Sequence, residues 1–172
     1  MEYEKLIRER FSVRNFLPEH LPQDCIDRIL EAGHRAPTGC NYQPQRILVL
    51  NRDEELALWG TCTRCDFGAP TAMQICHNTK ESWVRPYDGA LSSAVDAAIV
   101  ATHMMLEAHN IGVGCCWVMH FHPEKMKAAF GIPEGVEPCA LLVMGYPAEG
   151  AQPLPLHSAF RPMEETVFYG HF

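Results

Sequence analysis

The chain has 172 residues, of which 47% are hydrophobic and 20% charged, a composition typical of one folded domain and not of a disordered chain. Its net charge of -7 argues against the broad basic surface that non-specific nucleic-acid binding requires. No charge-free apolar run reaches the roughly 18 residues of a membrane span, and no signal-peptide pattern is present. We therefore expect a cytoplasmic protein with no membrane and no nucleic-acid partner, whose eight cysteines stay reduced.

Helical and strand patterns follow one another along the whole chain, without a repeat or a linker. In chain order we predict helices at 3–10 and 24–36, strands at 46–50 and 71–77, a helix at 90–109, a strand at 113–120, a helix at 122–130 and a strand at 139–146. Helix 90–109 is apolar nearly all round, which predicts a buried central helix. Because the helices separate the strands without a regular βαβ repeat, we predict an α+β fold.

The segment after Pro147 is rich in proline and continues into the sequence EETVFY. A proline-rich extended arm either lies along a partner subunit or follows the surface of its own protomer. The composition predicts an extended segment but leaves open what that segment covers.

Three polar residues alternate in the stretch RERFSVRNF, directly after the predicted first helix. In an extended segment Arg10, Ser12 and Arg14 project to one side. Two guanidiniums that flank a hydroxyl form a good receptor for a phosphate or another delocalised anion. The simpler alternative is a solvated charged face, to which we assign Arg8.

The loop APTGCNYQPQ, residues 36–45, joins a predicted helix to a predicted strand. Its candidate binding residues are Pro37, Thr38, Gly39, Asn41 and Gln43. Backbone N–H groups and amide side chains together donate and accept hydrogen bonds, as the edge of a heterocycle requires. A plain turn would explain the glycine and the prolines, but not why Asn41 and Gln43 share the segment.

Six segments together resemble the FMN-dependent nitroreductase family in its short form. In chain order they are RFSVR, APTGCNYQP, GAPTAMQIC, NIGVGCCWV, GVEPCALLVMGYP and RPMEETVFY. None is specific alone, but all six occur in the family's order over residues 5–169. The resemblance implies a nitroreductase-like fold, with a central mixed or antiparallel sheet of four to five strands flanked by helices in an intertwined homodimer. Residues 1–172 would form one FMN-binding domain, with 148–172 as a C-terminal arm onto the partner subunit.

The resemblance also implies a tightly bound FMN at the interface of the homodimer. Arg10 and Ser12 would hold its phosphate and ribityl end, and Arg14 would lie near the pyrimidine edge of the ring. Arg161, in RPMEE, would close on the phosphate from the C-terminal side.

The flavin ring itself would meet two further segments, according to the same resemblance. The Pro37–Asn41 loop would approach from the partner subunit or from the ring edge, with Asn41 bonding the ring and Gln43 as a weaker assignment. The backbone N–H groups of Met119 and His120 would face N5 and O4. Glycine is common at the second of these positions, so a positive φ there would cost His120 about 1 kcal/mol or more. The alternatives for the imidazole are a proton donor to the substrate and an ordinary strand-end histidine.

The reaction that the resemblance implies is a ping-pong transfer of two electrons. NADH or NADPH would pass hydride to flavin N5, and a small electron-poor acceptor such as a nitroaromatic or a quinone would then be reduced. Other family reactions, such as reductive dehalogenation, remain open, and so does a flavin-binding protein that stores FMN without turnover.

A C-x-x-C motif at Cys62 and Cys65 leaves a third class open, that of a metal-binding protein. Zinc would need four converging ligands, and the chain has no second C-x-x-C. A thioredoxin-like role would place the motif at the start of a helix, whereas this one closes a probable helix. We therefore predict no metal site.

Overall fold

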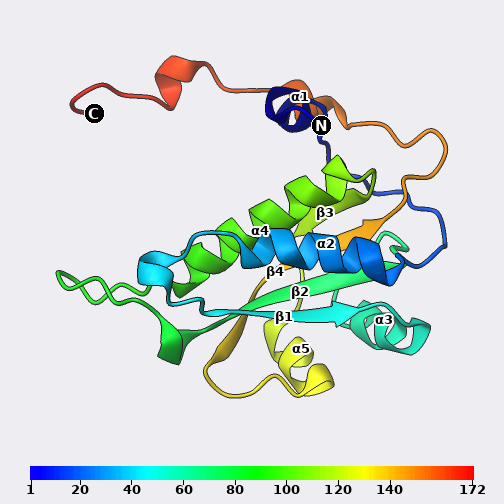
Figure 1. Cartoon of the computed structure of the whole chain (residues 1–172), viewed down its shortest axis with the longest axis horizontal. Helices are drawn as coiled ribbons and strands as arrows, with labels where there is room; N and C mark the ends of the chain where they lie inside the picture. The colour runs from blue at the N-terminus through cyan, green and yellow to red at the C-terminus, as the bar shows by residue number, and fades with distance from the viewer.

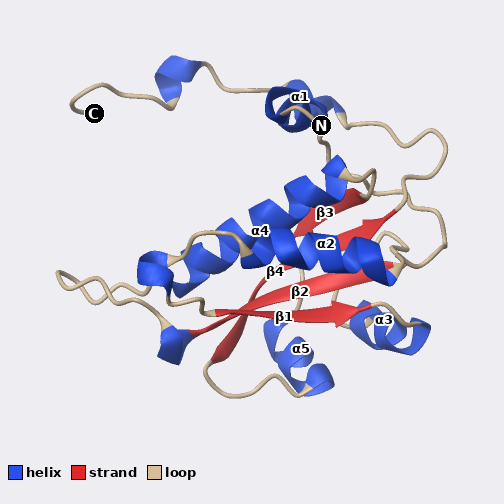
Figure 2. Ribbon diagram, viewed as in Figure 1, coloured by secondary structure: helices blue, strands red, loops and turns tan.

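The computed structural model describes all 172 residues. Figure 1 and Figure 2 show a twisted sheet with helices on both faces and a C-terminal segment that runs away from it. The helices are α1 (Tyr3–Glu9), α2 (Gln23–His34), α3 (Asp53–Gly60), α4 (Ser93–Asn110) and α5 (Pro123–Phe130). The strands are β1 (Gln45–Leu50), β2 (Thr71–Asn78), β3 (Gly114–Val118) and β4 (Val136–Gly145). Short 3-10 helices lie at Gly39–Asn41, Thr79–Glu81, Pro155–Ser158 and Met163–Glu165.

The strands form one sheet in the order β1-β2-β4-β3, and every neighbouring pair is antiparallel. The predicted α+β class is confirmed, and of the mixed or antiparallel sheets considered, the structure has the antiparallel one with four strands. All eight predicted helices and strands are present with shifted ends. One shift matters for function: β3 ends at Val118, so Met119 and His120 lie in the loop beyond the strand that was predicted to contain them.

The sheet is apolar on both faces, because alternate residues of each strand point to opposite sides. Met73, Ile75 and Leu142 pack on the side covered by α2 and α4. Leu141 and Val143 pack on the other side, which α3 and α5 cover. This two-sided core explains why the strands read as continuous apolar runs and not as alternating ones.

Helix α4 differs from its prediction as a helix buried all round. It buries Val100, Ala101 and Met104 against the sheet and α2, but Val95 on another side is 62% exposed. One chain therefore covers only part of the apolar surface of this helix. None of the helices is both long and apolar enough to cross a membrane.

All eight cysteine thiols are free. Cys115 and Cys116 point to opposite faces of β3 and belong to the two different halves of the core. Burial, together with the neighbouring Cys139, raises the pKa of Cys76 to about 12, and burial also raises the pKa of Cys115. Thiols that ionise so poorly are inert packing residues.

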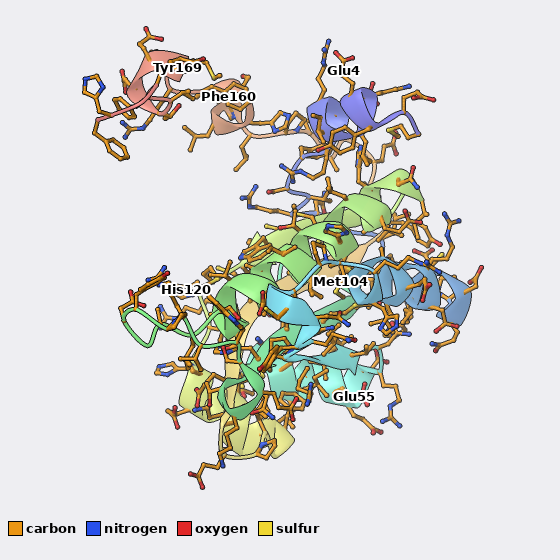
Figure 3. All side chains as sticks on the ribbon, turned by 60° about the vertical axis from the view of Figure 1, so that its left-hand side comes forward. Glu4, Glu55, Met104, His120, Phe160 and Tyr169 are labelled. Atoms are coloured by element: carbon orange, nitrogen blue, oxygen red, sulfur yellow. The ribbon has the colours of Figure 1, made fainter.

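The last residues of the chain extend away from the sheet, and Figure 3 shows Phe160 and Tyr169 on this segment. Both side chains are more than four fifths exposed. The hydrogen bonds of residues 160–172 are all formed within that segment. Residues 147–157, in contrast, stay on their own chain: Pro147 bridges to Phe16, and the ring of His157 meets that of Phe11 at a centroid distance of 6.4 Å.

Candidate functional site

The arginine-rich stretch lies along the free edge of β3. Ser12 forms a parallel bridge to Cys115, and the Val13 N–H donates to the Cys115 carbonyl at 3.1 Å. The two segments approach closely because residue 114 is glycine, where a Cβ would lie 2.8 Å from a methyl carbon of Val13. The buried Val13 side chain then faces the core, and its neighbours on either side face outward.

The outward side chains of Arg10, Ser12 and Arg14 line one cavity of about 290 Å³, as their alternation predicts. Phe11, Leu154, Leu156 and His157 complete its lining. The Arg10 guanidinium contacts the sulfur of Met105 at 3.9 Å. Arg14 donates to the Ser12 carbonyl at 3.2 Å and lies 5.9 Å from the centre of the Phe67 ring. None of these contacts neutralises a positive charge.

The lack of a carboxylate at this cavity is unusual within the chain. Nine of the fourteen lysines and arginines have a carboxylate oxygen within 4.0 Å. The exceptions are Arg10, Arg14, Arg64, Lys80 and Lys125. Burial, and then the charge of Arg10, lower the pKa of His109, so this histidine adds no charge beside Arg10 near neutral pH. The Arg10–Arg14 cavity is thus prepared for an external anion.

Arg161 does not join this cavity within one chain. It lies on the extended segment, its side chain is 78% exposed, and it forms an ion pair with Glu165 at 3.4 Å. Its predicted approach to the phosphate stays a prediction, because it would need the arm to reach a second subunit.

The predicted loop at residues 37–43 has a strained backbone. Cys40, Asn41 and Gln43 have φ angles of 47°, 59° and 50°, in the left-handed region that residues other than glycine rarely adopt. The Thr38 hydroxyl accepts a hydrogen bond from the Gln43 N–H at 3.1 Å and helps to hold this conformation. Such strain is found mostly where the surrounding structure imposes it, and often at functional sites. The residue types did not predict this strain, although asparagine tolerates the left-handed region better than most residues do.

A buried carboxylate that the sequence reasoning missed holds the loop in place. Asp96, 3% exposed, accepts a hydrogen bond from the Gly39 N–H at 2.9 Å and another from the Ser92 hydroxyl at 2.7 Å. Gly39 fits closely here, since a Cβ would lie 3.0 Å from the Ser92 hydroxyl oxygen. The sequence feature that could have revealed this carboxylate is its position as the single acid in the otherwise apolar stretch AVDAAIVA.

The loop and the Arg10–Arg14 cavity lie at opposite edges of the sheet. The loop leads into β1 at one edge, whereas residues 10–14 follow β3 at the other. Three strand spacings separate these edges, roughly 14 Å. Figure 1 shows the loop at the N-terminal end of α4 and the arginine-rich stretch toward its C-terminal end. One chain therefore does not bring these two groups of predicted residues together.

Met119 and His120 are exposed in the loop after β3. Neither backbone N–H donates to an acceptor within the chain. The φ angle of His120 is not positive, so the strain considered for this residue is absent. The Thr63 hydroxyl donates to the His120 carbonyl at 2.6 Å, and the His122 N–H donates to the Cys62 carbonyl at 2.8 Å. The C-x-x-C loop thus serves to dock against the segment after β3.

A second cavity, of about 490 Å³ and open to solvent, lies beside this contact. It is lined by Thr61, Cys62, Thr63, Arg64, Met119, His120, Phe121, His122 and Lys125. Nowhere in the chain are three or more histidine, cysteine, aspartate or glutamate side chains arranged to hold a metal ion.

Known proteins resemble this chain over most of its length. The model of the Nitroreductase family matches residues 7–74 and 63–146. A nitroreductase family protein of Clostridium difficile 630 is 31% identical in sequence, and its crystal structure superposes with a TM-score of 0.93 over 100% of both chains. An Archaeoglobus fulgidus protein provisionally named NADH dehydrogenase/NAD(P)H nitroreductase is 30% identical over 154 residues, which cover 84% of this chain and 85% of the relative. An FMN reductase (NAD(P)H) of Bacillus subtilis is 26% identical over 163 residues, 84% of this chain and 66% of that protein.

Proposed function

We infer the function of this chain from one premise: it belongs to the nitroreductase family. We propose that it is an FMN-dependent NAD(P)H oxidoreductase that reduces a small electron-poor molecule, such as a nitroaromatic or a quinone, by two electrons. The observation that carries this proposal is the cavity at which Arg10, Ser12 and Arg14 meet without any carboxylate. FMN, when bound, supplies the hydride relay at N5 between the nicotinamide and the acceptor in a ping-pong sequence. Reduced nicotinamides are available in the cytoplasm, where we place the protein.

The residues of the Arg10–Arg14 cavity fit the phosphate end of FMN. A phosphate monoester carries close to two negative charges, and planar guanidiniums bind its oxygens in a bidentate manner. Arg10 and the Ser12 hydroxyl would hold it, while Arg14, at the other end of the same stretch, would face the flavin ring. A neighbouring cavity of about 210 Å³, lined in part by Asn15 and Gln152, offers amide groups for a polyol chain.

Two free backbone donors suit the other end of the cofactor. Met119 and His120 follow the same edge strand as Ser12, and Met119 comes four residues after Cys115, roughly 13 Å along an extended chain. Their unpaired N–H groups would donate to the flavin ring where electrons enter and leave. Arg14 would stabilise negative charge on the pyrimidine edge, which favours the reduced cofactor. The chain would thus bind the flavin, orient it and polarise its ring, and we assign no side-chain acid to the reaction.

We propose that the active form is a homodimer with two such sites. Arg10, Ser12 and Arg14 of one chain would face the Pro37–Asn41 loop of the partner, with Asn41 bonding the ring and Gln43 beside it. The separation of these residues within one chain supports this arrangement, as does the uncovered side of α4 around Val95. The exposed segment 159–172 would reach the partner and bring Arg161 to the phosphate.

A visible spectrum followed by an anaerobic titration tests the proposed activity. Protein reconstituted with FMN is expected to keep flavin absorbance through gel filtration, and this absorbance should bleach on addition of NADH or NADPH. A protein that binds no flavin would contradict the proposal. A flavin that stays oxidised with both nicotinamides would support the alternative of a storage protein.

A complementation experiment tests the shared site. One variant carries Arg10→Gln with Arg14→Gln, the other carries Thr38→Val with Asn41→Ala, and each alone is expected to lose FMN. In co-expressed chains every mixed dimer regains one intact site, so about a quarter of all sites should hold FMN if the chains pair at random. Flavin content no higher than that of either variant alone would contradict the two-chain site, and each variant expressed alone is the control.

A further inference from the structure

Four basic side chains surround the cavity of about 490 Å³ that lies between the C-x-x-C loop and the start of α5. They are Arg64, His120, His122 and Lys125, and no aspartate or glutamate lines the cavity. We propose that this cavity is an anion subsite, which binds a phosphate or carboxylate group of the molecule that exchanges electrons with the flavin. The inference rests on the proposed function and adds a class of substrate to it.

The distribution of ion pairs supports the subsite. Five basic residues lack a carboxylate within 4.0 Å, and four of them fall into two pairs, each of which lines one cavity. Arg10 and Arg14 share the first, and Arg64 and Lys125 share the second, while Lys80 packs its methylene groups near Gly135. In an acidic chain where most cations are paired, two cavities with unpaired cations indicate two places for external anions.

The scaffold behind Arg64 is rigid. Thr63 and Cys62 are buried, and their hydrogen bonds to the His120 carbonyl and from the His122 N–H lock the loop onto the segment after β3. Arg64 follows directly and reaches into the cavity from this fixed point. A charged side chain whose backbone is already fixed loses less conformational entropy when it binds a ligand.

The position of Lys125 gives a second, independent indication. It occupies the first turn of α5, which begins at Pro123, where the partial positive charge of a helix disfavours a cation. Helix stability therefore does not account for a lysine at this point. An anion in the cavity would be attracted both by Lys125 and by the N-terminal end of α5.

The cavity also adjoins the proposed place of electron transfer, because it is lined by Met119 and His120, the residues whose backbone N–H groups are unpaired. An anion bound here would belong to a molecule that lies against the flavin ring. Two sources share this chemistry: the phosphates of the nicotinamide cofactor, and a carboxylate or phosphate on the acceptor. Substrates that differ only in charge separate the two.

The test compares the double variant Arg64→Gln with Lys125→Gln against the control Lys80→Gln, which also removes an unpaired cation. Acceptors are 4-nitrobenzoate and uncharged nitrobenzene with saturating NADH, and donors are NADPH and NADH with saturating nitrobenzene. We expect kcat/KM to fall about tenfold or more for 4-nitrobenzoate alone if the acceptor carries the anion, or for one or both nicotinamides if the donor does.

Binding of inorganic pyrophosphate, measured by calorimetry on the FMN-loaded and the flavin-free protein, provides a readout without turnover. When FMN fills the Arg10–Arg14 cavity, the double variant is expected to bind pyrophosphate at least tenfold more weakly than the Lys80→Gln control, and when that cavity is open it should lose one of two pyrophosphate sites. Equal pyrophosphate binding together with unchanged kcat/KM for every substrate would overturn the subsite and leave the oxidoreductase intact. A protein without FMN or turnover would refute the proposed function, while pyrophosphate binding would still report on the cavity.

Discussion

Replacing Arg10 and Arg14 together by glutamine is expected to weaken FMN binding by about a hundredfold or more. Hydrogen bonds to charged groups contribute about 1.5–3 kcal/mol each, so two lost guanidiniums remove at least about 3 kcal/mol. The loss should be this large because Arg10 and Arg14 are the only arginines or lysines of their own chain that line this cavity. Titration of the flavin-free protein with FMN, followed by flavin fluorescence, measures the change.

Arg8→Gln is the matched control for this prediction. Arg8 lies two residues before Arg10, is exposed and pairs with Glu4 at 2.7 Å, so its removal also takes away a positive charge, one where the double variant loses two, but leaves the Arg10–Arg14 cavity untouched. We expect this variant to bind FMN like the unaltered protein. If the double variant bound FMN as tightly as Arg8→Gln, the phosphate would have to lie elsewhere, and the cofactor site proposed here would be wrong.

Replacing Asp96 by alanine is expected to lower the free energy of unfolding by about 1–3 kcal/mol, because it leaves two partly buried donors, the Gly39 N–H and the Ser92 hydroxyl, without an acceptor. The loop that contains three residues in the left-handed region should also lose its conformation, since strained backbone persists only where contacts enforce it. Urea unfolding measures the first effect, and the protease sensitivity of the bonds near Asn41 measures the second.

Two further variants make the Asp96 prediction specific. Asp96→Asn keeps an oxygen acceptor for the Gly39 N–H and should lie between the alanine variant and the unaltered protein in stability. Asp24→Ala removes an exposed acid from the first turn of α2 and should leave the urea midpoint nearly unchanged. A midpoint for Asp96→Ala equal to that of Asp24→Ala would show that this carboxylate does not hold the loop.

Local patterns were enough to predict several features of the site. The alternation of Arg10, Ser12 and Arg14 predicted their common side, because an extended backbone sends alternate side chains the same way. The apolar runs predicted the four strands, and the structure shows that they are continuous because the sheet is covered on both faces. The third strand was predicted to reach His120 but ends at Val118, and the Thr63 hydroxyl of the C-x-x-C loop holds the His120 carbonyl beyond that end.

Composition and short-range spacing thus determined the α+β class, the common side of Arg10, Ser12 and Arg14, and the place of the polar loop. The tertiary structure alone decided that Asp96 reaches Gly39 and that Thr63 reaches His120, contacts between residues 57 positions apart in each case. It also decided that the two groups of predicted cofactor residues lie at opposite sheet edges and that Arg64 and Lys125 share a cavity. The physical reason is that periodicity and turn chemistry act over a few residues, whereas a site is assembled by strand order and packing, which bring distant segments together or keep them apart.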